Sequence, residues 1–217
     1  CDWDNVPLHL PSTFPAMQAL SGSPDVRVAM LGHHGLAWPW ESLHVEALAW
    51  FDHWLKGRDT GILEGPRIRF VVPGVDEWEA SDVWPPEGTR LAELALRSDG
   101  VLGDAEPEGE HRSFVELGAG LNRRPPKPTD APSSLSWETS VLDAPLDLLG
   151  DSELVLHASS TAADTAWIVT VQDVSEDGTV ENVTAGWLRA GLRTVDEDRS
   201  RPGRPVLDCR TFDAVPL

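Results

Sequence analysis

The first sixty residues carry the hydrophobic pattern of a buried strand followed by a long helix. Val26 to Leu31 is continuously apolar apart from one arginine, which predicts a strand covered on both faces, as in a parallel sheet. From Glu41 to Lys56, apolar residues recur every three or four positions and predict a helix with one face toward the core. That face comprises Leu43, Ala47, Trp50, Phe51 and Trp54. A shorter helix is predicted from Pro11 to Leu20.

Beyond Gly65 the pattern changes to short alternating runs separated by turn signals, which favours an all-β sandwich. Tight turns are expected at Asp99-Gly100 and Asp177-Gly178. The Pro-rich stretch from Asn122 to Ser134 is typical of an extended surface connection. The candidate strands are Ile68–Val72, Leu91–Leu96, Leu154–Ala158, Trp167–Val174 and Val183–Leu192.

Composition and net charge limit the classes of binding partner that we expect. The chain has 217 residues, 41% of them hydrophobic, enough for one large domain or about two ordinary ones. Its net charge of -19 would repel phosphate backbones and anionic lipids, so neither nucleic acid nor a membrane is an expected partner. Cys1 and Cys209 form neither a disulfide framework nor a CxxC zinc motif. No apolar run approaches the roughly 20 residues that span a bilayer, and we expect a soluble, cytoplasmic protein.

Two adjacent histidines, His33 and His34, follow the first predicted strand, where open α/β sheets place their chemistry. Asp4 is the natural partner, because a carboxylate on imidazole Nδ1 fixes the tautomer and stabilises the cation formed when Nε2 accepts a proton. An Asp before a His fits the last two members of the Ser, Asp, His order of α/β hydrolases. No G-x-S-x-G elbow occurs, so a serine nucleophile would lie outside these residues.

Two other interpretations of the sequence compete with a serine hydrolase. A metal-dependent enzyme could draw ligands from His33, His34, His44, Asp52 and His53, but their spacing matches no H-E-x-x-H motif, and no metal or other cofactor is predicted. The 10 tryptophans could form the surface of a non-catalytic binding module, although core packing is their commoner role. The acidic stretch from Asp104 to Glu110 is typical of a solvated loop rather than a calcium site.

Three motifs are similar to segments of one known family. Trp3-Asp4-Asn5 resembles a G-W-Y-D segment, and residues 46–57, EALAWFDHWLKG, resemble E-A-x-x-W-F-D-x-W-L-K-G. Val72-Pro73-Gly74, followed by Glu77-Trp78 and Trp84-Pro85, resembles the strand and loop that open a C-terminal β domain. These segments are those of the cocaine-esterase-like and X-Pro dipeptidyl-peptidase-like serine hydrolases, whose jelly-roll strands the stretches 142–150 and 164–178 also resemble.

The resemblance implies roles for the polar residues. Asp4 would be the triad acid and His34 the triad base, because His34 precedes a glycine as the family histidine does; His33 is the alternative. The family motif is G-P-W-x-H-G, whereas this chain has Gly32-His33-His34-Gly35. The substrate would be a small-molecule ester or amide, or a peptide, and oligomerisation stays open.

The resemblance also implies an architecture. Residues 1–64 would be the end of an α/β-hydrolase domain, and residues 65–217 an all-β jelly-roll (galactose-binding-like) sandwich, mainly β overall. Family members carry the nucleophile elbow before the segment where this chain begins and further strands beyond Leu217, so we expect a fragment that is inactive by itself, and secretion stays open. A non-catalytic β-sandwich binding module is the alternative function.

Overall fold

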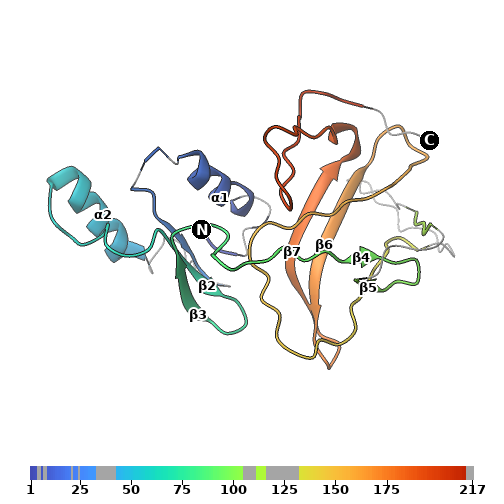
Figure 1. Ribbon diagram of the computed structural model, residues 1–217, viewed down its shortest axis with the longest axis horizontal. Coiled ribbons are helices and arrows are strands. Elements are labelled where there is room, and N and C mark those ends of the chain that lie inside the picture. The colour runs from blue at the N-terminus through green and yellow to red at the C-terminus, as the bar shows by residue number, and fades with distance from the viewer. Residues whose placement is uncertain are drawn as a thin grey trace, which may run out of the picture. The chain divides into compact units, whose positions relative to one another are not determined.

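The structure is a computed structural model of the chain. It describes residues 1–3, 6, 9–20, 22–23, 25–32, 43–104, 111–115 and 132–213. The chain forms two compact units, of which the first comprises residues 1–89 and 149–217 and the second residues 90–148. More of the described residues lie in strands than in helices, so the fold is mostly β with few helices (Figure 1). No helix in the described ranges is long and apolar enough to cross a lipid bilayer.

A three-stranded sheet organises the N-terminal part of the first unit. Strand β1 (Val28–Met30) pairs in parallel with β2 (Ile68–Val72), and β2 pairs antiparallel with β3 (Glu77–Ser81). The predicted strands at residues 26–31 and 68–72 are therefore confirmed, and the first of them does pair in parallel as expected. Its pairing with residues 68–72, which the sequence pattern assigned to the β domain, was not predicted. Strand β3 was not predicted from the sequence.

The sheet and helix α1 (Leu10–Ala19) enclose the apolar core. The helix was predicted at residues 11–20, and Pro11 lies in its first turn, where a missing N–H costs nothing. Trp84 stacks on Phe14 with ring centroids 3.9 Å apart and meets Phe70 edge-on at 5.5 Å. The buried core residues are Phe14, Met17, Met30, Ile68, Phe70 and Trp84.

Helix α2 (His44–Lys56) ends where the sequence predicts, but part of its predicted core-facing stripe is exposed. Gly57 adopts φ 64°, and its N–H donates to the carbonyl of His53 at 3.0 Å, a glycine-capped helix end. The expected core-facing stripe is wrong for Phe51 and Trp54, which are 57% and 47% exposed. An ion pair between Arg69 and Glu46 links the helix to β2. Periodicity marks which face of a helix is apolar but not what covers it, and in the described structure neither ring is buried.

The second unit contains the short hairpin of β4 (Ala95–Leu96) and β5 (Leu102–Gly103). Gly100 at φ 90° occupies the predicted Asp99-Gly100 turn. Only the last two residues of the predicted strand 91–96 are in β4, since β5 offers a partner of just two residues. Most of the predicted connection at 122–134 lies outside the described residues.

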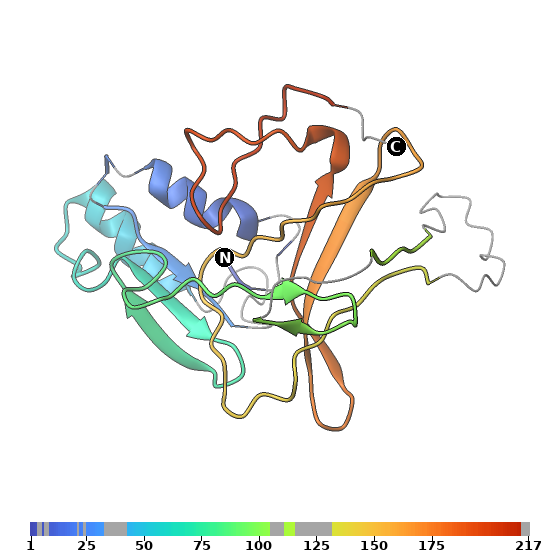
Figure 2. The ribbon, with the colours of Figure 1, turned by 45° about the vertical axis from the view of Figure 1, so that its right-hand side comes forward.

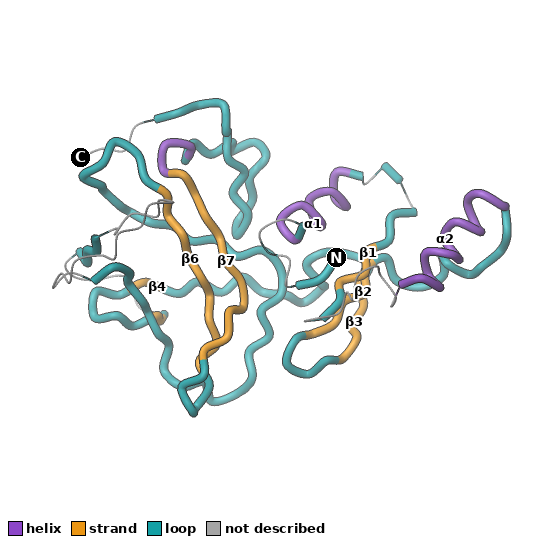
Figure 3. Tube along the Cα trace, turned by 180° about the vertical axis from the view of Figure 1, so that it is seen from behind, coloured by secondary structure: helices purple, strands orange, loops and turns teal. Residues whose placement is uncertain are grey.

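A long antiparallel ribbon completes the first unit. It joins β6 (Ala166–Val174) to β7 (Val180–Arg189) through the Asp177-Gly178 turn, where Gly178 has φ 84° (Figure 3). A short 3-10 helix, Ala190–Leu192, follows β7. The strand predicted at Leu154–Ala158 was wrong: these residues form no ladder, so their backbone pattern remains irregular.

The described strands form three separate sheets rather than a closed one. The domain boundary predicted after residue 64 stays a prediction. Strands β1 and β2 lie on either side of that boundary, yet they share one sheet.

Candidate functional site

The three residues predicted to carry catalysis, Asp4, His33 and His34, lie outside the described residues. The structure does describe the segments that lead into them. Asp2 and Leu31 form a parallel β-bridge, in which Leu31 donates its N–H to the Cys1 carbonyl at 2.9 Å. Trp3 in turn donates its N–H to the Leu31 carbonyl at 3.3 Å. The chain before Asp4 and the chain before His33 therefore run side by side in the same direction.

Trp3 fixes the first of these segments on the sheet. Its indole N–H donates to the carbonyl of Val71 in β2 at 2.7 Å. Its ring lies 6.2 Å from the ring centroids of both Phe14 and Trp84. The hydrogen bond and the aromatic contacts act together, since a half-buried indole needs a partner for its N–H as well as packing for its ring.

Gly32, in the segment before His33, lies very close to strand β2. A Cβ atom at this position would meet Cγ1 of Val71 at 3.0 Å and Oδ1 of Asp76 at 3.8 Å. The tight contact with Val71 favours glycine here. Asp76 lies in the turn between β2 and β3 with φ 55°, a conformation that Asp tolerates better than most residues.

Asp76 is a carboxylate that the sequence reasoning did not consider. It lies 44 positions after Gly32, and only the parallel pairing of β1 with β2 brings the turn after β2 beside the end of β1. The signal available in the sequence was the Val72-Pro73-Gly74 turn, which marks the end of a predicted strand, although that strand was assigned from the sequence to the β domain rather than to the sheet of β1. A second acid thus lies beside the residue that precedes the histidine pair.

Two of the residues considered as metal ligands, Asp52 and His53, contact other groups instead. Both carboxylate oxygens of Asp52 are engaged, one by Lys56 and the other by Arg58 at 2.7 Å. The hydrogen bond from Lys56, with help from Arg58 and against the desolvation of a buried group, lowers the pKa of Asp52. Nδ1 of His53 contacts the Arg58 carbonyl at 3.1 Å. Within the described ranges, no three His, Cys, Asp or Glu side chains gather as a metal site would need.

Tryptophans exposed on the described surface do not form a binding row. Trp54, Trp78 and Trp187 are each about half exposed, at 47%, 52% and 54%, but they belong to α2, β3 and β7 respectively. Trp3 and Trp84 belong to the core and its margin. A ligand platform made of three tryptophans on one sheet face is therefore not present among the described residues.

Comparison with known proteins assigns the chain to a family. Residues 18–210 match the model of the X-Pro dipeptidyl-peptidase C-terminal non-catalytic domain. The chain belongs to this family. The match begins inside α1 and continues through β7, so it includes every strand described above.

Relatives of this family member are named as hydrolases. A Mycobacterium bovis protein named as a candidate serine esterase is 33% identical over 193 residues, which are 79% of this chain and 30% of the relative. The cocaine esterase of a Rhodococcus species is 25% identical over 173 residues, which are 67% of this chain and 30% of that enzyme. The chain thus spans about 30% of the length of the curated relatives it matches.

Solved structures show the same fold. The CocE/NonD family hydrolase of Staphylococcus aureus superposes with a TM-score of 0.67 at 14% identity, over 100% of this chain and 40% of that one. An aminopeptidase from a marine sediment archaeon, Thaumarchaeota archaeon, gives a TM-score of 0.61 at 21% identity, over 92% of this chain and 40% of that one. Residues 18–210 therefore correspond to the C-terminal non-catalytic domain of the X-Pro dipeptidyl-peptidase family, and these solved structures share the fold of the chain.

Proposed function

We propose that this chain is the C-terminal part of a serine hydrolase that cleaves acyl esters or amides through an acyl-enzyme. Family membership and the hydrolase names of its relatives support the class of reaction. In this proposal, residues 1–64 complete an α/β-hydrolase domain and the later strands belong to a jelly-roll sandwich. The substrate is a small-molecule ester or amide, or a peptide, and the nucleophilic serine lies outside these 217 residues.

The proposed roles follow from the chemistry of the side chains. His34 takes the proton of the attacking serine as a general base and returns it to the leaving group as a general acid. Asp4 accepts a hydrogen bond from the imidazole and stabilises its cation. His33 is the alternative base, since it precedes His34 directly in the sequence.

One observation carries this proposal. The bridge between Asp2 and Leu31 aligns the two segments that lead into Asp4 and into the histidine pair. A triad acid and base have to come from neighbouring chain segments, because the hydrogen bond between them spans about 3 Å. Asp76 is a second acid, beside Gly32, which precedes the histidine pair in the sequence, and it must be compared with Asp4.

The test is active-site labelling of the full-length gene product with a fluorophosphonate. The H34Q variant should lose labelling, and D4N should slow it by roughly a thousandfold or more. Asp2→Asn is the matched control, because it removes a carboxylate two residues from Asp4, and it should label like the wild type. The D76N variant should also label normally.

The outcomes separate the candidates. Loss of labelling in H33Q but not in H34Q would move the base to His33, and slow labelling in D76N but not in D4N would move the acid to Asp76. Labelling that survives both histidine substitutions would overturn the proposal. Rates on a p-nitrophenyl ester and on an Xaa-Pro p-nitroanilide would then distinguish esterase from peptidase.

A further inference from the structure

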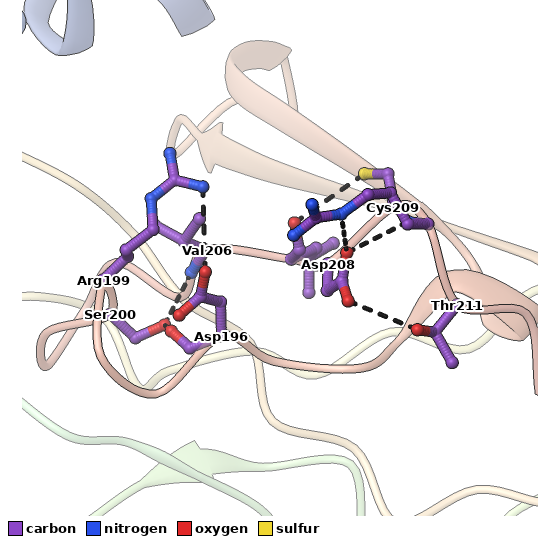
Figure 4. A network of polar contacts seen from close by, with 9 residues as sticks. Asp196, Arg199, Ser200, Val206, Asp208, Cys209 and Thr211 are labelled. Carbon is purple, nitrogen blue, oxygen red and sulfur yellow. Dashed lines mark hydrogen bonds and ion pairs between the residues drawn. The ribbon is translucent and has the colours of Figure 1, made fainter.

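Arg199, Arg201 and Arg204 lie in one loop, residues 195–207, whose two ends are joined by hydrogen bonds. The Ser200 hydroxyl donates to the carbonyl of Asp196 at 2.6 Å and accepts the N–H of Val206 at 2.9 Å (Figure 4). The N–H of Asp196 donates to the Val206 carbonyl at 2.8 Å. Because the two ends of the loop are tied together in this way, the side chains at 199, 201 and 204 project from a defined backbone.

The loop lies beside helix α1 (Figure 2). Residues of both line a hollow of about 370 Å³. The walls are Pro15, Gln18 and Ala19 from α1, and Arg199, Arg201, Arg204 and Val206 from the loop. Every charged residue in this lining is an arginine. Three arginines in one lining are notable in a chain that has 17 basic and 36 acidic residues.

Nearby carboxylates neutralise two of the three guanidinium groups, to different degrees. Arg201 pairs with Asp151 at 3.1 Å. Within the described part of the chain, Arg199 pairs with a single acid, Asp196 at 3.7 Å, and its side chain is 70% exposed. A long, exposed pair of this kind contributes little, so Arg199 is free to turn toward another anion.

Arg204 is the decisive residue. It is half-buried, and its guanidinium donates to the amide oxygen of Gln18, which is neutral. Among the described residues no carboxylate pairs with it. Glu153 contacts the loop through its backbone, accepting from the N–H of Gly203 at 3.1 Å. A partly desolvated cation facing a hollow without a counter-charge is stabilised by any oxyanion that enters it.

We propose that this hollow is a binding site for a phosphate group. Arg204 forms its floor, with Arg201 and Arg199 closing on the anion from the loop. A phosphate group presents three or four oxygens to these donors, whereas one carboxylate has two, and the planar guanidinium fork matches phosphate geometry. The lining of the hollow includes none of the catalytic residues proposed above.

Titration calorimetry of the 217-residue protein with inorganic phosphate, at constant ionic strength against chloride, tests the proposal. The wild type should bind one phosphate saturably. R204Q should weaken binding by roughly tenfold or more, the loss expected for a charge-assisted hydrogen bond. R199Q should weaken it less, and because that side chain is largely exposed, this variant keeps the test valid if R204Q fails to fold.

Arg210→Gln is the matched control. It removes the same charge from an arginine that is 89% exposed, pairs with Asp208 and does not line the hollow. Equal weakening by R204Q and R210Q, absence of saturable binding, or tighter binding of glutarate than of phosphate would each overturn the proposal. Tighter binding of phenyl phosphate than of inorganic phosphate would support it and assign the group to a larger phosphate ester, and equal binding would support it with free phosphate as the ligand.

Discussion

Trp3 and Val71 stand 68 positions apart, and the indole N–H of the first donates to the backbone carbonyl of the second at 2.7 Å. This bond ties the segment before Asp4 to strand β2. It runs beside the bridge between Asp2 and Leu31, so the same small region carries both the aromatic packing of Trp3 and the alignment of the proposed catalytic segments.

Replacement of Trp3 by Phe should lower the free energy of unfolding by about 1 kcal/mol, because it removes the hydrogen bond and keeps most of the ring contact. Urea unfolding measures the difference. Trp78→Phe is the control: Trp78 is 52% exposed, and its loss should cost less than about 0.5 kcal/mol. Equal costs for the two variants would show that the indole bond contributes nothing.

Asp52 should make stability depend on pH in the acid range. Its ordinary pKa is 3.8, and the Lys56 hydrogen bond lowers the pKa in the folded protein. A carboxyl with a lowered folded pKa binds protons more readily when unfolded, so its stabilisation is fully present above pH 3.8 and is lost as the pH falls through the folded value. Wild type and D52N should therefore differ in urea midpoint at neutral pH and converge below that range. A constant difference down to strong acid would contradict this.

Gly150 should tolerate alanine worse than Gly178 does. Both glycines have positive φ, 104° and 84°, so each substitution pays a backbone penalty of about 1 kcal/mol. At Gly150 the new Cβ would also meet Cγ of Pro85 at 2.9 Å, whereas at Gly178 nothing lies within 4 Å. G150A should therefore destabilise by roughly 1–3 kcal/mol more than G178A in thermal unfolding. Equal melting temperatures for G150A and G178A would show that the Pro85 ring does not crowd a side chain at position 150.

Asp164 should anchor the end of the β6–β7 ribbon. Its carboxylate accepts from Arg189 and from the N–H of Gly191 at 2.8 Å, and the Arg189 hydrogen bond is the main cause of its lowered pKa. Asp164→Ala should lower the melting temperature and speed hydrogen exchange at the Gly191 amide, because that N–H loses its acceptor. Glu197→Ala, an exposed acid on the following loop, should change neither. Unchanged exchange at Gly191 in D164A would refute the anchor.

The local pattern of apolar and polar residues was sufficient to predict the elements that are periodic in the sequence. The α1 and α2 helices, strands β1, β2, β6 and β7, and both Asp-Gly turns follow from spacing and turn chemistry. The pattern failed where pairing decides: residues 77–81, largely exposed and with two glutamates, form β3 only because β2 offers them a partner, and the apolar run at 154–158 has none.

By itself, therefore, the sequence determined the periodic elements and, through its motifs, the family. Periodicity states which face of a helix is apolar but not what covers it, so the exposure of Phe51 and Trp54 was decided by tertiary structure. The same holds for the meeting of Asp76 with Gly32 and of Arg204 with Gln18, which is 186 positions away. Contacts of this range depend on strand pairing and on the packing of distant segments, and no local spacing encodes them.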